Sequence, residues 1–189
     1  MNISFTKLHG CGNDYLFVDC LEQPLERAGE IARVLSDRRR GVGSDGLICI
    51  YPAATADLRM EMYNADGSRG AMCGNGIRAL GKYAYEHGLV ASTRLSVDTD
   101  SGPRRLELHL TGDLVETVSV EMGRPSFEPA KIPVASQEKA VAIPLKVAGR
   151  TWTVTCLSMG NPHCVTFDAD PEGLDLEALG PAFACHPFF

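Results

Sequence analysis

The fold of this chain is decided by one short stretch, MCGNGIR at residues 72–78. It continues into residues 79–87, where apolar side chains recur at helical spacing, and Gly88 follows as a natural helix stop. Cys73 is therefore expected at the start of a helix. The first turn of a helix carries unpaired N–H groups and a partial positive charge, which favour a thiolate and bind carboxylate or phosphate. The stretch thus predicts a reactive thiol beside an anion site.

The alternative is that Cys73 is a buried structural cysteine before a glycine-containing helix. Free cysteines are among the most buried residues, which supports this alternative. Its surroundings favour a functional site instead. Polar residues and glycines are poor core material, and this part of the sequence is dense in them: Asn64, Asp66, Gly67, Ser68, Gly74, Asn75 and Gly76.

The composition of the 189-residue chain is that of an ordinary globular protein, with 44% apolar and 22% charged residues. A net charge of −6 argues against non-specific nucleic-acid binding. The first residues lack a signal-peptide pattern, and no apolar run reaches membrane-spanning length, so we expect a cytosolic protein without a membrane partner. Seven cysteines with no C-x-x-C spacing indicate neither a disulfide framework nor a zinc site, and most are expected to be reduced and buried.

In the first half of the chain, alternating or apolar runs predict strands at 3–9, 15–18, 47–51 and 57–63. Periodic apolar residues predict a helix over 24–40, and the arginines at 38–40 are interpreted as solvent-exposed cations at its C-terminus. The glycine-rich loop 41–46 lies between a helix and a strand. This is the reverse of the order in dinucleotide-binding folds, so nucleotide binding is discounted.

In the second half, strands are predicted at 94–99, 105–110 and 114–122, and the three prolines within 123–133 mark the passage into a second unit. There we expect a hairpin of strands 141–147 and 151–157, and a short helix within 171–185. The segment SMGNPHCVTFD at 158–168 echoes GNDYLFVD at 12–19, which suggests a duplicated fold. The predicted domains are residues 1–122 and 123–189.

Five motifs, in this order, resemble the diaminopimelate epimerase family: FTKLHGCGNDY (5–15), GVGSDG (41–46), YNADGS (63–68), MCGNGIR (72–78) and SMGNPH (158–163). The resemblance implies an α+β fold of two pseudo-symmetric domains, each a β-sheet or open barrel wrapped around a central helix. Residues 1–122 would form the N-terminal domain with the first catalytic cysteine. Residues 123–189 would be the first part of a C-terminal domain that is incomplete in this sequence.

Members of this family interconvert LL- and meso-diaminopimelate without a cofactor or a metal. One cysteine removes the α-proton while a second supplies a new one on the opposite face. The resemblance implies that Cys73 is one of the pair, and that His163 is the histidine that tunes the protonation of both. It implies substrate contacts from Asn13, Asn64, Gly74, Asn75 and Asn161.

The resemblance also implies that the family's second catalytic cysteine lies beyond Phe189, together with a glutamate, an arginine and a further asparagine that hold the substrate. Cys11, Cys156, Cys164 and Cys185 do not stand at that position. Some members carry glutamine where Gly46 stands here. A homodimer is the oligomeric state expected from the family.

Three other interpretations stay open at this point. A cysteine-nucleophile hydrolase would need a histidine beside the thiol. A fragment that binds the substrate without turnover would keep the anion-binding helix start. A proline racemase relative would share the two-thiol chemistry but prefer a different substrate.

Overall fold

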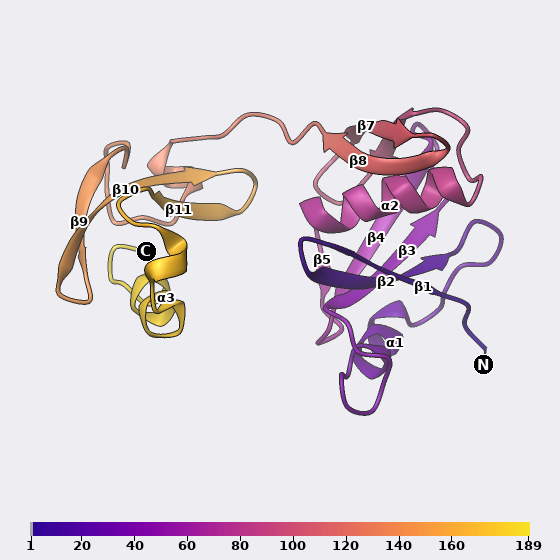
Figure 1. Ribbon diagram of the computed structural model, residues 1–189, viewed down its shortest axis with the longest axis horizontal. Coiled ribbons are helices and arrows are strands. Elements are labelled where there is room, and N and C mark those ends of the chain that lie inside the picture. Colours follow the sequence, from indigo (N-terminus) through magenta and orange to yellow (C-terminus); the bar gives the residue numbers. More distant parts are fainter. Residues whose placement is uncertain (1) are drawn as a thin grey trace. The chain divides into compact units, whose positions relative to one another are not determined.

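The computed structural model describes residues 2–189 (Figure 1). The chain forms two compact units, the first ending at Met122 and the second running from Gly123 to Phe189. Each unit has its own apolar core, so each is described by itself.

The first unit is built on one mixed sheet, with strand order β1-β2-β3-β4-β6-β7-β8 and β5 attached to β4. Its strands are β1 (Thr6–Gly10), β2 (Asn13–Asp19), β3 (Gly46–Tyr51), β4 (Leu58–Asn64), β5 (Arg69–Gly70), β6 (Arg94–Asp98), β7 (Arg104–Thr111) and β8 (Leu114–Val120). Two neighbouring pairs, β2 with β3 and β4 with β6, are parallel. Parallel pairs need crossover connections. Helix α1 (Ala28–Leu35) lies in the first crossover, and helix α2 (Gly74–Glu86) lies in the second.

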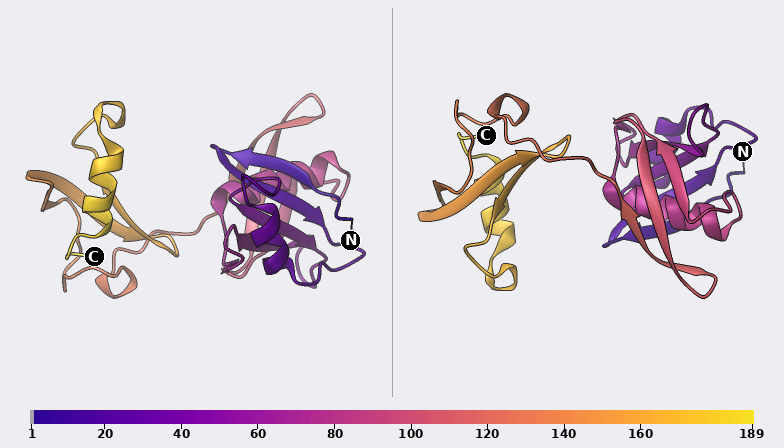
Figure 2. Two further views of the ribbon diagram at one scale, coloured as in Figure 1. Left: turned by 90° about the horizontal axis from the view of Figure 1, so that it is seen from below. Right: turned by 90° about the horizontal axis from the view of Figure 1, so that it is seen from above.

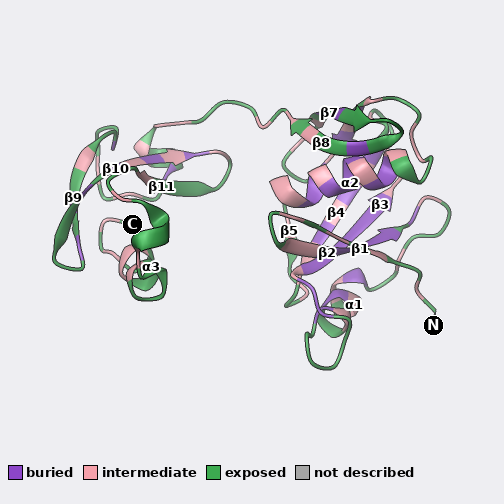
Figure 3. Cartoon of the chain, viewed as in Figure 1, coloured by how far each residue is buried: buried purple, intermediate pink, exposed green. Residues whose placement is uncertain are grey.

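The two helices lie on opposite faces of the sheet (Figure 2). Successive strand residues point to opposite faces, so Phe17 and Ile48 pack in the cluster of α2, whereas Leu16 and Leu47 pack in the cluster of α1. This double burial explains why β2 and β3 are nearly continuous apolar runs. Their buried residues form the centre of the unit in Figure 3.

Helix α2 confirms the prediction made from residues 72–88. It begins after Cys73, whose backbone is extended and whose sulfur accepts a hydrogen bond from the Gly76 N–H at 3.4 Å. Ile77, Leu80 and Ala84 are fully buried on one face and fill the concave side of the sheet. The helix ends before Gly88, which has φ +72°. The mixed sheet curled around α2 agrees with the expected architecture, whereas the pseudo-symmetry of two domains stays a prediction.

The helix predicted over 24–40 is shorter, because α1 runs only from Ala28 to Leu35. Arg27 has a left-handed backbone, with φ 57°, so the helix cannot extend further toward Pro24. At the other end, the Asp37 carboxylate accepts the N–H groups of Arg39 and Arg40 and starts a turn. The arginines at 38–40 therefore follow the helix rather than ending it.

The second unit contains a three-stranded antiparallel sheet of order β11-β10-β9: β9 (Ile143–Val147), β10 (Arg150–Ser158) and β11 (Pro162–Thr166). Ala148 and Gly149 both have positive φ and form the predicted two-residue hairpin turn. Helix α3 (Leu176–Ala184) packs on the sheet, with Phe183 edge-to-face against Trp152. Two short 3-10 helices complete the unit, η1 (Pro129–Lys131) and η2 (Pro171–Gly173).

The two segments that echo each other in the sequence both form hairpins. Strands β1 and β2 join through Gly12, which has φ 83°, and strands β10 and β11 join through Gly160, which has φ 106°. This positive φ favours glycine at both turns. The local likeness is present, and duplication of the whole fold stays a prediction.

Candidate active site

The Cys73 thiol lies half-buried at the start of α2, between a hydrogen-bond acceptor and a donor. Its Sγ donates to the Asn13 side-chain oxygen at 3.2 Å and accepts from the Gly76 N–H at 3.4 Å. Asn13 is the first residue of β2, directly after the β1–β2 turn. The start of α2 and the start of β2 together therefore hold the sulfur in place.

The same helix start offers unpaired backbone donors. Within residues 2–189, the N–H groups of Gly74 and Asn75 have no backbone or side-chain acceptor. Arg78, one turn further on, donates to the Gly74 carbonyl at 3.1 Å and also to the Asn75 side-chain oxygen. Free N–H groups, the helix dipole and a nearby guanidinium suit a carboxylate.

Tyr15 is a neighbour of Cys73 that the sequence prediction did not include. Burial, and next the neighbouring Cys73, raise the pKa of the Tyr15 hydroxyl above its ordinary value, so the phenol stays protonated. It lies on the same face of β2 as Asn13, because residues two apart on a strand share a face. Alternation along the predicted strand could have placed Tyr15 beside Asn13 from the sequence alone.

Behind Asn13 lies a network of charged groups. The Asn13 amide donates to the Asp45 carboxylate at 2.7 Å, and the same carboxylate oxygen accepts the Asp14 N–H at 3.1 Å. Arg38 donates to the other Asp45 oxygen at 2.9 Å and to Asp14 at 2.6 Å. Arg38 is solvent-exposed, as predicted, but it pairs with Asp14 and Asp45 and so links the residues behind Asn13.

The hydrogen bond from Arg38, with a further one from Lys7, holds the pKa of Asp14 well below its ordinary value. A depressed folded-state pKa contributes stability above the unfolded pKa near 4, and this contribution is lost as the pH falls through the folded pKa. We expect Asp14→Asn to lower the free energy of unfolding by roughly 1–2 kcal/mol at pH 7. The difference from the parent should shrink steadily below about pH 4. Urea titrations at several pH values measure it.

Asp113→Asn is the matched control, because Asp113 lies exposed in the β7–β8 turn and makes no ion pair within residues 2–189. Its difference from the parent should be small and independent of pH. A constant Asp14→Asn difference down to pH 2 would contradict the assigned role of Arg38.

Asn64 is the last residue of β4 and lies at the same end of the strands as Asn13, the first residue of β2. The register pairs Tyr15 with Gly46 and Gly46 with Asn64, so two strand spacings, roughly 10 Å, separate Tyr15 from Asn64. The Asn64 amide donates to the Ser68 hydroxyl at 2.9 Å and closes the predicted turn. A side chain at Gly46 would meet the Tyr63 carbonyl oxygen, because a Cβ there would lie 2.2 Å from it. In this backbone arrangement only glycine fits at position 46.

The other two predicted site residues belong to the second unit. Asn161 lies in the β10–β11 turn, and His163 lies on β11, opposite Leu157. The His163 ring nitrogen Nε2 and the Asn161 side-chain oxygen form a hydrogen bond of 3.0 Å, and both residues are exposed. The predicted residues therefore form two groups: Asn13, Asn64, Cys73, Gly74 and Asn75 in the first unit, and Asn161 and His163 in the second.

The remaining cysteines are less buried than expected. Cys20, Cys49 and Cys156 are buried, whereas Cys11, Cys164 and Cys185 are exposed. Among the described residues, no group of three or more His, Cys, Asp or Glu side chains is arranged to hold a metal ion. Within 2–189, no helix combines the length and apolar character needed to cross a membrane.

A hydrolase dyad is not formed around Cys73. Among the residues that the structure describes in the first unit, no histidine nitrogen forms a hydrogen bond with its sulfur. A cysteine nucleophile of that class needs such a base. The arrangement therefore does not favour the hydrolase interpretation.

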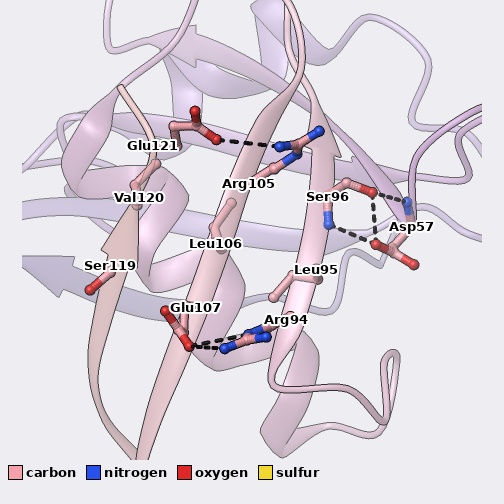
Figure 4. A pocket seen from close by; sticks show the side chains of 10 residues that line it. All are labelled: Asp57, Arg94, Leu95, Ser96, Arg105, Leu106, Glu107, Ser119, Val120 and Glu121. Carbon is pink, nitrogen blue, oxygen red and sulfur yellow. Dashed lines mark hydrogen bonds and ion pairs between the residues drawn. The ribbon is translucent and has the colours of Figure 1, made fainter. Parts of the chain in front are cut away.

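A hollow of about 580 Å³ lies over strands β6 to β8 (Figure 4). Its charged side chains are engaged with one another or with a hydroxyl: the pairs are Arg94 with Glu107, Arg105 with Glu121, and Asp57 with Ser96. Convergent free polar groups are what distinguish a binding site. This hollow has none comparable with the start of α2, so it is not the candidate site.

Comparisons with known proteins agree with this arrangement. The profile described as "Diaminopimelate epimerase" matches residues 5–128. Diaminopimelate epimerases of Desulforudis audaxviator and Agathobacter rectalis are 48% and 44% identical to the chain. Both alignments cover 99% of this chain and 68% of the relative. The chain thus spans about two thirds of the length of these relatives.

Solved structures with low identity show the fold. A Bacillus anthracis phenazine biosynthesis protein of the PhzF family has a TM-score of 0.58 at 20% identity, covering 87% of this chain and 54% of that one. A hydroxyproline epimerase of Agrobacterium vitis has a TM-score of 0.56 at 13% identity, covering 93% and 51%. These TM-scores show that the chain shares its overall fold with both structures. With the family profile and relatives 44% and 48% identical, the chain belongs to the diaminopimelate epimerase family.

Proposed function

We propose that this protein epimerises LL-2,6-diaminopimelate to meso-diaminopimelate, with Cys73 as one of two thiols that exchange the α-proton. The observation that carries the proposal is the Cys73 thiol beside the unpaired N–H groups of Gly74 and Asn75. The reaction would serve lysine and peptidoglycan precursor biosynthesis. As part of the same proposal, the enzyme acts in the cytosol as a homodimer and uses no cofactor.

In this proposal the substrate α-carboxylate binds at the start of α2. The N–H groups of Gly74 and Asn75 donate to it and stabilise the negative charge that develops when the α-proton leaves. Cys73 then lies beside the α-carbon and takes or returns the proton, while the second thiol acts on the opposite face. Asn13, Asn64, Asn161 and His163 keep the substrate-binding and tuning roles that the family resemblance implies.

The test incubates this chain with LL-diaminopimelate in D2O and follows two signals by NMR, deuterium at the α-carbon and the meso form. We expect deuterium exchange, because Cys73 and the helix start suffice to reach the α-proton from one side. Meso product in addition would mean that a second acid acts within residues 1–189. A folded chain that gives neither exchange nor saturable binding of diaminopimelate would overturn the proposal.

Proline and hydroxyproline serve as comparison substrates in the same assay, because solved structures of that activity class share the fold. Exchange of diaminopimelate alone supports the proposed substrate. Exchange of proline alone would instead assign the chain a proline racemase activity.

A further inference from the structure

The orientation of the Asn13 amide decides which hydrogen-bonding group faces Cys73. An amide has one acceptor end and one donor end, and the two ends have nearly the same shape. With its oxygen toward the sulfur, Asn13 accepts a hydrogen bond from the S–H group. This contact stabilises the thiol, so the proton stays on the sulfur. With its nitrogen toward the sulfur, it would donate to a thiolate instead.

Asp45 removes this ambiguity. An ionised carboxylate can only accept hydrogen bonds, so the Asn13 NH2 group must face it, at 2.7 Å. The amide oxygen is then left to face the Cys73 sulfur, at 3.2 Å.

Asp45 is itself held in place on both oxygens. One oxygen accepts the Asn13 amide and the Asp14 N–H, and the other accepts Arg38 at 2.9 Å. The Asp45 N–H donates to the Asp14 carbonyl at 2.8 Å, which links the loop before β3 to the start of β2. The carboxylate can therefore not turn away from Asn13 without losing several bonds.

We propose that Asp45 is a positioning residue, which fixes the Asn13 amide so that its oxygen retains the proton on the substrate-free Cys73 thiol. This inference rests on the proposed function for its importance in turnover. The Gly76 N–H on the other side of the sulfur favours the thiolate, so the two contacts oppose each other. Asp45 acts through Asn13 to favour the protonated form.

The test measures alkylation of Cys73 by iodoacetamide at pH 7, without substrate, because only the thiolate reacts. Mass spectrometry follows the Cys73 peptide, and the exposed Cys185 in the same chain serves as the internal reference. In Asp45→Asn either end of the Asn13 amide can face position 45. We expect the alkylation rate of Cys73, relative to Cys185, to rise about threefold to tenfold, the effect of one hydrogen bond.

Asp14→Asn is the matched control, because it removes one negative charge beside Asp45 and Arg38 without touching the Asn13 amide. It should change the rate by less than about twofold. The decisive variant is Asp45→Asn in an Asn13→Ala background, where the proposal requires no further effect of position 45.

The proposal is overturned if Asp45→Asn reacts like the parent, if Asp14→Asn gives the same increase, or if the increase persists without Asn13. Far-UV circular dichroism checks that each variant folds. The readout needs no turnover, so failure of the deuterium-exchange assay would leave this result intact and would count against the proposed function alone.

Discussion

Replacing Cys73 by serine is expected to lower the rate of α-proton exchange by about 10²–10⁴-fold, the usual contribution of a positioned acid or base. Serine should preserve the fold, because its hydroxyl can cap α2 by accepting from the Gly76 N–H, as the sulfur does. The hydroxyl is a far weaker acid than a thiol and does not form the basic anion at neutral pH. Exchange in D2O followed by NMR measures the loss.

Cys185→Ser is the control for this substitution, because Cys185 is an exposed cysteine at the end of α3. It should exchange the α-proton at the parent rate. If Cys73→Ser kept more than a tenth of the parent rate while Cys185→Ser lost it, the catalytic role would have to move away from the start of α2.

Leu80→Ala is expected to lower the free energy of unfolding of the first unit by about 2–5 kcal/mol. Leu80 is fully buried at the centre of α2, in the core that joins this helix to the curled sheet. Truncation to alanine removes apolar contacts and leaves a cavity that a close-packed core fills only in part. Urea denaturation followed by far-UV circular dichroism gives the difference.

Leu114→Ala makes the same chemical change at a position that is 63% exposed in the β7–β8 hairpin. It should change the free energy of unfolding by less than about 0.5 kcal/mol. Equal effects of the two substitutions would mean that α2 does not carry the core of the first unit.

Patterns within one segment were enough to predict much of the fold. Alternation over 57–63 identified β4, and helical spacing after Cys73 identified α2. Both ends of α1 were missed, because its start depends on a left-handed backbone at Arg27 and its end on a turn at Asp37, which periodicity does not encode. The two-residue strand β5 is too short to show a period at all.

The candidate site divides in the same way. Cys73 and the free N–H groups followed from local sequence, since a helix start has the same chemistry in any protein. The roles of Asp45 and Arg38 did not, because each depends on a side chain that meets a partner from a distant segment. Such pairs leave no periodic signal. In the sequence alone, the loop that carries Asp45 stood out only by the polar, glycine-rich character of residues 41–46.

The two crossovers also determine when this site can form during folding. Asn13 and Asp45 are 32 residues apart, and Asn13 and Cys73 are 60 apart. Contacts of such long range require loop closures that hairpins do not, and they slow folding. The β7–β8 and β9–β10 hairpins can form early, whereas the hydrogen bond from Cys73 to Asn13 needs β2, β3 and α2 together. A folding chain therefore carries an unprotected Cys73 until its topology is nearly complete.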